Sequence, residues 1–216
     1  MAYLLGASRL LALEKPSGGV RPIDVGEVLY RLVARTLGFQ FREALADHFS
    51  PLQFGVATRG GCETIIHGLH ATLDLHPDWV VLQVHVKETL GGALFALAHL
   101  HALRTTASKH PLCLFPSLAD DTHIVGPPEA VVPAFHTLEG HLSAVDLNVQ
   151  PTKCAAWSPS GLSSSLSLPP GFSLPSAGLR VLGAPIGSDS FQASFVRDAL
   201  EVDVSTVHQL PLLGDP

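Results

Sequence analysis

Apolar residues recur at helical spacing between residues 26 and 49, and this is the clearest periodic pattern in the chain. Arginines and acidic residues occupy the positions between them, so the pattern predicts an amphipathic helix. Gly38 is where this helix would divide, and Ser50-Pro51 is expected to end it. The apolar members are Val28, Leu29, Leu32, Val33, Leu37, Phe41, Leu45 and Phe49.

Shorter apolar runs predict β-strands, and the run 80–86 is typical of a buried strand. Two strands are expected at 112–117 and 122–125, on either side of Ala119-Asp120-Asp121, as an antiparallel hairpin. Residues 158–178, rich in Ser, Pro and Gly, are expected to form a loop. This order of elements indicates an α+β fold. The other expected strands are 10–13, 20–23, 153–157 and 180–183, and the other expected helices are 62–73, 92–106, 129–144 and 191–210.

The composition predicts one compact domain, alone or with an appendage. With 216 residues, of which 46% are hydrophobic and 15% are charged, the chain can bury a core. Its formal net charge of −6 argues against tight autonomous binding of nucleic acid, which needs a basic surface. A local basic stripe is nevertheless available from Arg21, Arg31, Arg35 and Arg42.

The three cysteines, Cys62, Cys113 and Cys154, lie far apart and lack the spacing of a zinc site. They are expected to be reduced thiols of an intracellular protein, in the nucleus or the cytoplasm. The apolar segment 1–13 lacks the basic start of a signal peptide and is expected to enter the fold as a strand. No apolar run is long enough to span a bilayer, so no membrane is expected as a partner.

Asp120 and Asp121 are the first candidates for chemistry. Adjacent carboxylates repel each other, and a divalent cation would relieve that repulsion. Oxygen ligands suit Mg²⁺, and two-metal phosphoryl transfer uses such carboxylates. The alternative is a solvated turn, where Asp is common for its local hydrogen bonds. The pairs His67/His70 and His99/His101 are expected to be structural, because no third ligand is apparent for either.

Five motifs follow one another along the chain: 13–23 with 26–33, 50–56 with 60–63, Leu118-Ala119-Asp120-Asp121, 146–154 with Trp157, and 181–188. In this order they resemble the motifs of a reverse transcriptase domain from a plant-like retrotransposon without long terminal repeats (LINE type). The third motif resembles the [YFL]-A-D-D sequence that this family carries on a strand–turn–strand hairpin. Each motif is weakly specific, and the ordered set carries the resemblance.

The resemblance implies a partial right-hand polymerase fold with a central Asp-Asp hairpin. It implies a fingers-like segment 1–78, a shortened palm 79–157, the loop 158–178, and a primer-grip-like strand with the start of a thumb at 179–216. RNA template and DNA primer would be the partners and Mg²⁺ the cofactor. Asp120 and Asp121 would be the inherited catalytic metal ligands. The inherited contacts to nucleotide, template or phosphate would be Arg21, Lys15 and Lys153.

Two departures from the family pattern predict that the chain is catalytically inactive. His85 follows the strand 80–84 where the family has a catalytic Asp, so the third carboxylate is absent. Residues 90–97 resemble the helix of a later palm motif and follow almost at once, which indicates an internal deletion near Lys87-Glu88-Thr89. Removal of one member of a cooperating catalytic set commonly costs roughly 10³-fold or more. Loss of the palm interior is expected to cost more, because positioning supplies most of phosphoryl-transfer catalysis.

Three alternatives stay open. The first is a non-catalytic module that binds nucleic acid or protein through the helix carrying Arg31, Arg35 and Arg42. The second is a metal-dependent phosphodiesterase or manganese site that uses His85 with Asp120, since Mn²⁺ and Zn²⁺ accept nitrogen more readily than Mg²⁺. The third is a poorly folded remnant, in which the strand 80–84 and the helix from Gly92 expose apolar faces and aggregate.

Overall fold

A computed structural model describes residues 8–14, 19–26, 28–87, 92–163 and 166–209. The chain divides into two compact units, Met1–His48 and Phe49–Pro216, and each is described by itself. The four segments predicted from the sequence were defined by likeness to a polymerase. A division into compact units does not test them, so they stay a prediction.

The first unit begins with a β-hairpin. β1 (Ser8–Glu14) and β2 (Val20–Gly26) pair antiparallel along their whole length. The helices α2 (Val28–Gln40) and α3 (Arg42–Phe49) follow, so the predicted helix 26–49 breaks at Phe41 and not at Gly38. Gly38 is tolerated because an exposed helical glycine costs only about 1 kcal/mol relative to alanine.

The second unit is built on a five-stranded antiparallel sheet in the order β4-β5-β3-β6, with β7 also paired to β3. The central strand β3 (Val80–Lys87) pairs with β5 (Asp121–Gly126), which pairs in turn with β4 (Ser117–Leu118). On its other side β3 pairs with β6 (Asn148–Val149) and β7 (Ala155–Trp157). The predicted α+β class is therefore confirmed.

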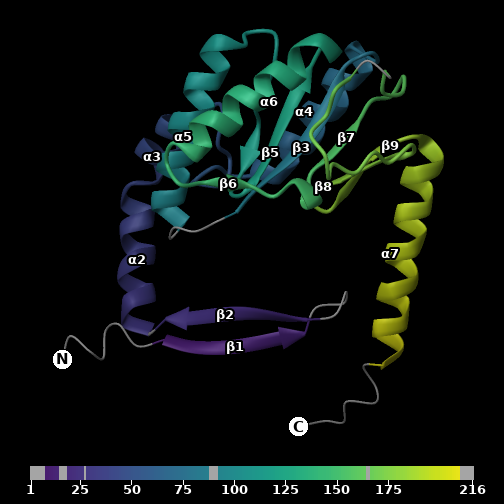
Figure 1. Cartoon of the computed structure of the whole chain (residues 1–216). Helices are drawn as coiled ribbons and strands as arrows, with labels where there is room; N and C mark the ends of the chain where they lie inside the picture. Colours follow the sequence, from purple (N-terminus) through teal and green to yellow (C-terminus); the bar gives the residue numbers. More distant parts are fainter. Residues whose placement is uncertain (1–7, 15–18, 27, 88–91, 164–165, 210–216) are drawn as a thin grey trace. The chain divides into compact units, whose positions relative to one another are not determined.

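Helices and a second hairpin cover the two faces of this sheet (Figure 1). On one face, α5 (Gly92–Lys109) and α6 (Pro128–Ser143) form a core with Leu82, Val84 and Val86 of β3. Side chains alternate along a strand, so Val81, Gln83 and His85 point to the other face. There α4 (Gly61–Leu75), β8 (Gly178–Val181) and β9 (Ala184–Gly187) pack with Val81, Val125 and Trp157.

The expectation that the strand 80–84 and the helix from Gly92 expose apolar faces was wrong. Val80, Val81, Leu82 and Val84 are at most 1% exposed. The core-facing side of α5 is buried in the same way, with Phe95, Leu100 and Leu103 at most 2% exposed. The short connection between β3 and α5 therefore does not prevent the second unit from closing a core.

Three local predictions also differ from the structure. Of the expected strand 112–117 only Ser117 is in a strand, as the first residue of β4, since Pro111 and Pro116 cannot donate to a ladder and Leu114 forms only an isolated bridge to Val125. The expected strand 180–183 contains a turn, because Leu182 and Gly183 adopt φ values of 50° and 90° that suit a two-residue hairpin loop. The expected strand 153–157 starts only at Ala155, after the 3₁₀ turn η1 (Pro151–Lys153).

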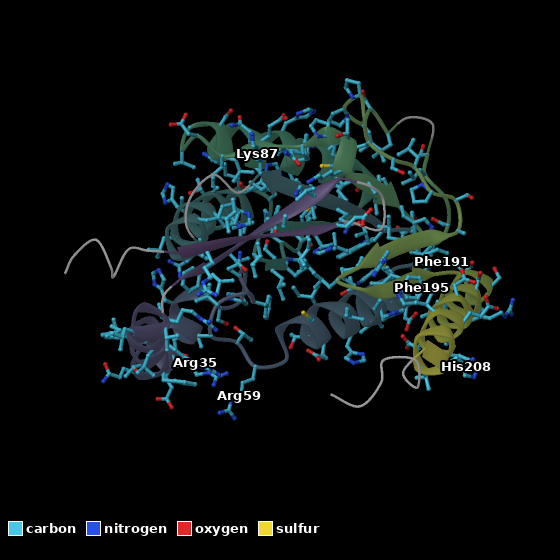
Figure 2. The ribbon with its side chains drawn as sticks, turned by 90° about the horizontal axis from the view of Figure 1, so that it is seen from below. Arg35, Arg59, Lys87, Phe191, Phe195 and His208 are labelled. Atoms are coloured by element: carbon cyan, nitrogen blue, oxygen red, sulfur yellow. The ribbon has the colours of Figure 1, made fainter. Side chains whose placement is uncertain are left out.

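Helix α7 (Asp189–Gln209) begins against the β8–β9 hairpin. Figure 2 shows Phe191 and Phe195 close together at this junction, where their ring centroids lie 6.4 Å apart and the Arg180 guanidinium lies 5.5 Å from the Phe195 centroid. A Cβ at Gly178 or Gly187 would lie 2.6 or 2.8 Å from Cδ1 of Phe191, so both glycines permit the close approach. Within the described part of the chain, no helix is both long enough and apolar enough to cross a membrane.

Candidate metal centre

The hairpin between β4 and β5 turns through Ala119 and Asp120, because Leu118 pairs with Asp121. Ala119 adopts a φ of 52°, a conformation that such loops usually fill with glycine. This turn places Asp120 at the tip and Asp121 at the first position of β5. Both predicted carboxylates therefore lie at the same end of the sheet.

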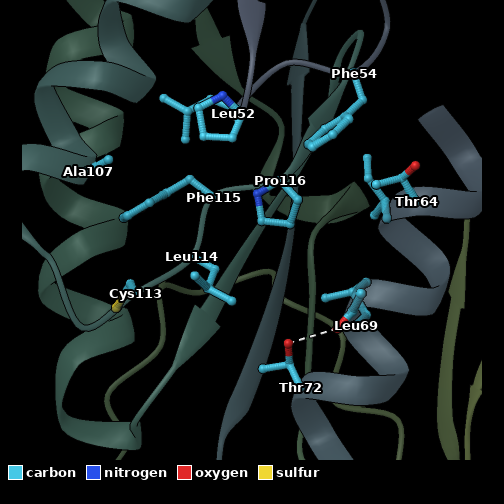
Figure 3. Close-up of a pocket in the computed structure, with 13 residues that line it drawn as sticks. Leu52, Phe54, Thr64, Leu69, Thr72, Ala107, Cys113, Leu114, Phe115 and Pro116 are labelled. Carbon is cyan, nitrogen blue, oxygen red and sulfur yellow. Dashed lines mark hydrogen bonds between the residues drawn. The ribbon is translucent and has the colours of Figure 1, made fainter. Parts of the chain in front are cut away.

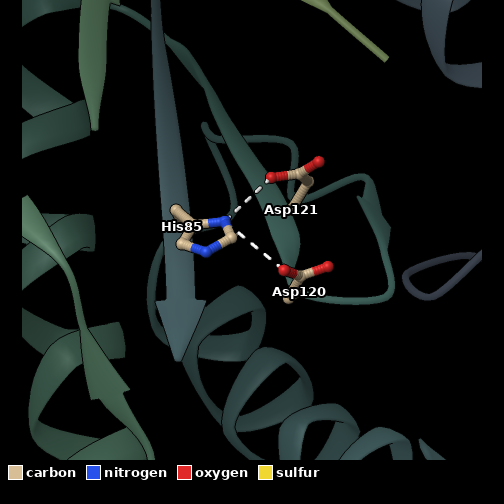
Figure 4. Close-up of side chains that lie close together, drawn as sticks. All are labelled: His85, Asp120 and Asp121. Carbon is tan, nitrogen blue, oxygen red and sulfur yellow. Dashed lines mark hydrogen bonds and ion pairs between the residues drawn. The ribbon is translucent and has the colours of Figure 1, made fainter. Parts of the chain in front are cut away.

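Strand β3 brings His85 beside these carboxylates. His85 pairs with Asp121 across the two strands, and Val86 N–H donates to the Asp120 carbonyl at 2.9 Å. His85 Nδ1 lies 3.2 Å from Asp121 Oδ1 and 3.5 Å from Asp120 Oδ2 (Figure 4). Among the described residues, this is the one group of three or more metal-ligating side chains whose ligand atoms lie within 4.8 Å of one another. The cluster could therefore hold a metal ion.

Lys153 joins the cluster from η1, with its Nζ 3.3 Å from His85 Nε2. An ammonium group can only donate a hydrogen bond, and an ionised carboxylate can only accept one. We therefore assign the imidazole proton to Nδ1, which donates to Asp121, while Nε2 accepts from Lys153. His85 thus bridges a positive and a negative side chain.

The cluster is accessible from solvent on its carboxylate side. The His85 side chain is 18% exposed, while those of Asp120 and Asp121 are 36% and 33% exposed. A hydrated ion can therefore reach the oxygens while the imidazole stays held by the sheet.

Cys154 contacts the backbone of His85 but is not a metal ligand. Its Sγ accepts from the His85 backbone N–H at 3.4 Å and its thiol donates to the Gln150 carbonyl at 3.2 Å. Burial raises the pKa of the Cys154 thiol, so it stays protonated at neutral pH. Because only a thiolate binds metal well, Cys154 supports the end of β3 and leaves coordination to the three other side chains.

The buried side chain of Gln53 forms a clamp, that is, a set of hydrogen bonds that holds the turn at Ala119 and Asp120. Gln53 is 1% exposed, and its Oε1 accepts from the backbone N–H groups of Ala119 and Gly55, each at 2.9 Å. Its Nε2 donates to the Ala119 carbonyl at 3.2 Å. One side chain therefore satisfies both backbone groups of the residue that precedes Asp120, and holds its left-handed conformation.

His99 of α5 links this clamp to β5. Gln53 Nε2 donates to His99 Nδ1 at 3.2 Å, so His99 carries its proton on Nε2 and donates to Thr122 Oγ1 at 2.9 Å. Burial lowers the pKa of His99 to about 4, so the neutral imidazole that this network requires is the stable form at neutral pH. The network thus holds Ala119 and Thr122, the residues on either side of the two carboxylates.

The sequence predicted the residues of the cluster in part, and it did not predict the hydrogen-bond network that supports them. Asp120, Asp121, His85 and Lys153 come together. Arg21 lies in β2 of the first unit, where only its backbone is described, and Lys15 lies outside the described residues. His99 was expected to be structural, and it is, but its link to Gln53 and Thr122 had no signal in residue spacing because the three come from separate elements.

A separate apolar pocket of about 310 Å³ lies between α4 and the segment that leads into β4 (Figure 3). Its walls include Leu52, Phe54, Leu69 and Phe115. The hydroxyl of Thr72 donates to the Gly68 carbonyl in its own helix and is not offered to the pocket. None of the lining residues belongs to the carboxylate cluster, so the pocket adds nothing to its chemistry.

A scan against models of known protein families and a search of curated proteins each found no match.

Proposed function

We propose that the chain is a degenerate reverse transcriptase domain of a retrotransposon that does not catalyse nucleotidyl transfer. The proposal combines the ordered motifs of the sequence with one structural observation. Asp120 and Asp121 lie at a hairpin tip beside the end of β3, and the residue of β3 that faces them is His85. In the proposed ancestor this position would carry the third carboxylate.

Mg²⁺ is the ion that this resemblance implies, and the residues fit it only in part. Asp120 and Asp121 offer oxygen ligands, and waters or substrate phosphates would complete the coordination. His85 offers nitrogen, which Mg²⁺ accepts poorly. Two-metal phosphoryl transfer needs carboxylates that bridge two ions, so this set would support one weakly held Mg²⁺ and no polymerase chemistry.

Primer extension on an RNA template tests the proposal. We expect no product with Mg²⁺ or Mn²⁺ from the natural chain, at the level of an Asp120→Asn variant run beside it. Extension by the natural chain that is lost in Asp120→Asn would show a working polymerase and overturn the proposal.

A restoration variant separates the two proposed causes of inactivity. His85→Asp returns the third carboxylate but not the missing palm interior, so it should remain inactive. Extension by this variant would mean that His85 alone abolishes activity and that the interior is dispensable.

RNA template and DNA primer remain proposed partners through the helical arginines of the first unit. Arg31 and Arg35 are exposed on α2, and Figure 2 labels Arg35. Phosphate contacts by these side chains would make retention of a labelled duplex on a filter fall steeply as salt rises. Retention that is absent at low salt, or that does not change in an Arg31→Ala/Arg35→Ala variant, would remove this role.

A further inference from the structure

We propose that the cluster of His85, Asp120 and Asp121 binds a transition-metal ion that accepts nitrogen, with Zn²⁺ bound more tightly than Mn²⁺. We further propose that Lys153 competes with this ion for the cluster. The inference concerns the site of the proposed function, but it does not require polymerase descent.

Two of the three separations between the ligand atoms match a small tetrahedral ion, and all three atoms lie within 4.8 Å of one another. A Zn²⁺ ion with bonds of 2.0–2.1 Å to nitrogen and oxygen separates tetrahedral ligand atoms by about 3.3 Å. His85 Nδ1 lies 3.2 and 3.5 Å from one oxygen of each carboxylate. Three protein ligands, from β3, the β4–β5 turn and the first position of β5, would leave a fourth position for water, and the one-third exposure of the aspartates gives that water access.

The nitrogen and oxygen ligands of the cluster determine which ion it binds most tightly. One imidazole and two carboxylates suit Zn²⁺ and Mn²⁺, and at such a mixed site Zn²⁺ binds more tightly than Mn²⁺. Mg²⁺ prefers oxygen ligands only and loses its waters reluctantly, so it should bind the weakest of the three.

Lys153 contacts the imidazole of the cluster, with its Nζ 3.3 Å from His85 Nε2. Its ammonium holds His85 in the tautomer with a proton on Nδ1, the nitrogen that a metal ion would need. Ion binding moves that proton to Nε2 through solvent, with no net gain or loss, and the new Nε2–H can no longer accept from Lys153. The ammonium must then move away, and it also repels the incoming positive charge.

Calorimetry of the full chain with zinc, manganese and magnesium chlorides tests the site. We expect the affinity order Zn²⁺, Mn²⁺, Mg²⁺. His85→Ala should weaken Zn²⁺ binding roughly tenfold or more while leaving Mg²⁺ binding unchanged. His85→Asp should bring the affinities for Mg²⁺ and Zn²⁺ closer together.

Lys153→Met supplies a test that misfolding cannot imitate, because it should strengthen Zn²⁺ binding by roughly tenfold. Lys109→Met is the matched control, since Lys109 Nζ lies 3.1 Å from His141 Nε2 in a second lysine–histidine pair that is not part of the cluster. It should leave the affinity unchanged.

Three results would overturn the proposal: Mg²⁺ binding as tight as Zn²⁺, Zn²⁺ affinity insensitive to His85→Ala, or equal gains from Lys153→Met and Lys109→Met. Primer extension fails or succeeds independently of all three. A polymerase-active chain that binds Zn²⁺ as described would refute the proposed function and keep this inference.

Discussion

Gly55 shows how tightly the carboxylate turn is supported at the scale of one residue. A Cβ at position 55 would lie 2.6 Å from the Ala119 backbone nitrogen and 2.9 Å from Gln53 Oε1. Backbone cannot yield as a flexible side chain can, so Gly55→Ala should push the turn away and break the Gln53 clamp. We expect a loss of about 1–3 kcal/mol in the free energy of unfolding, measured by urea titration.

Gly140→Ala is the control for this change. Gly140 lies inside α6, and a Cβ there meets nothing within 4 Å. Alanine should stabilise that helix by about 0.5–1 kcal/mol. Equal effects of the two substitutions would mean that the close approach at Gly55 has no energetic weight.

Single residues of the site divide into those that the sequence could predict and those that it could not. Asp120 and Asp121 are adjacent in sequence, and His85 lies within an evident apolar run, so a pattern could indicate all three. Gln53 gave no such signal. Its role depends on an unusual geometry at Ala119, 66 residues away, and only the folded chain brings the two together.

At the scale of elements, His99 couples α5 to the hairpin through its protonation state. Its contacts are Gln53, Thr122 and the Phe95 ring, none of which carries a charge. Burial lowers the pKa of His99 from 6.5 to about 4. The folded state therefore favours the neutral form, so this stability is fully present above pH 6.5 and is lost as pH falls toward about 4.

Urea unfolding at about pH 7 and about pH 5 measures this contribution. His99 should account for about 2 kcal/mol of the stability lost between these two values. His99→Gln keeps a donor and an acceptor but does not titrate, so its loss should be smaller by that amount. The matched control is His101→Gln, an exposed change on the same helix, which should behave like the natural chain. If His99→Gln and the natural chain lose equal stability between these two pH values, the contribution does not come from His99.

Elements with strong periodicity were predictable, and elements set by pairing were not. The strand at 80–86 and the helix at 62–73 agree closely with β3 and α4, because the apolar run of β3 is buried on both faces of the sheet and the apolar residues of α4 face one core. The two-residue strand β6 has too few residues to make a pattern and exists only because it pairs with the end of β3. The turn at Leu182-Gly183 was not predicted, because Leu182 continues an apolar run and its positive φ has no signal in the sequence.

At the scale of the whole molecule, the two units differ in how well they bury apolar residues. Both core clusters lie entirely within residues 49–216. In the first unit, by contrast, α2 exposes a series of large apolar side chains, each at least 48% exposed: Val28, Leu29, Leu32, Val33 and Leu37. Helix α7 of the second unit exposes a similar series, Val196, Leu200, Val202, Val204 and Val207. Surfaces of this kind favour association, so solubility is expected to be limited by α2 and α7 and not by the sheet.

A fragment of residues 49–216 tests this division. Removal of the first 48 residues takes away no member of either core cluster, so the fragment should unfold in one cooperative urea transition with a midpoint close to that of the full chain. It should also scatter less light at equal concentration, because the exposed face of α2 is gone. Its Zn²⁺ affinity should equal that of the full chain, since His85, Asp120, Asp121 and Lys153 all remain. A fragment that unfolds without cooperativity would show that residues 1–48 are needed to complete the core.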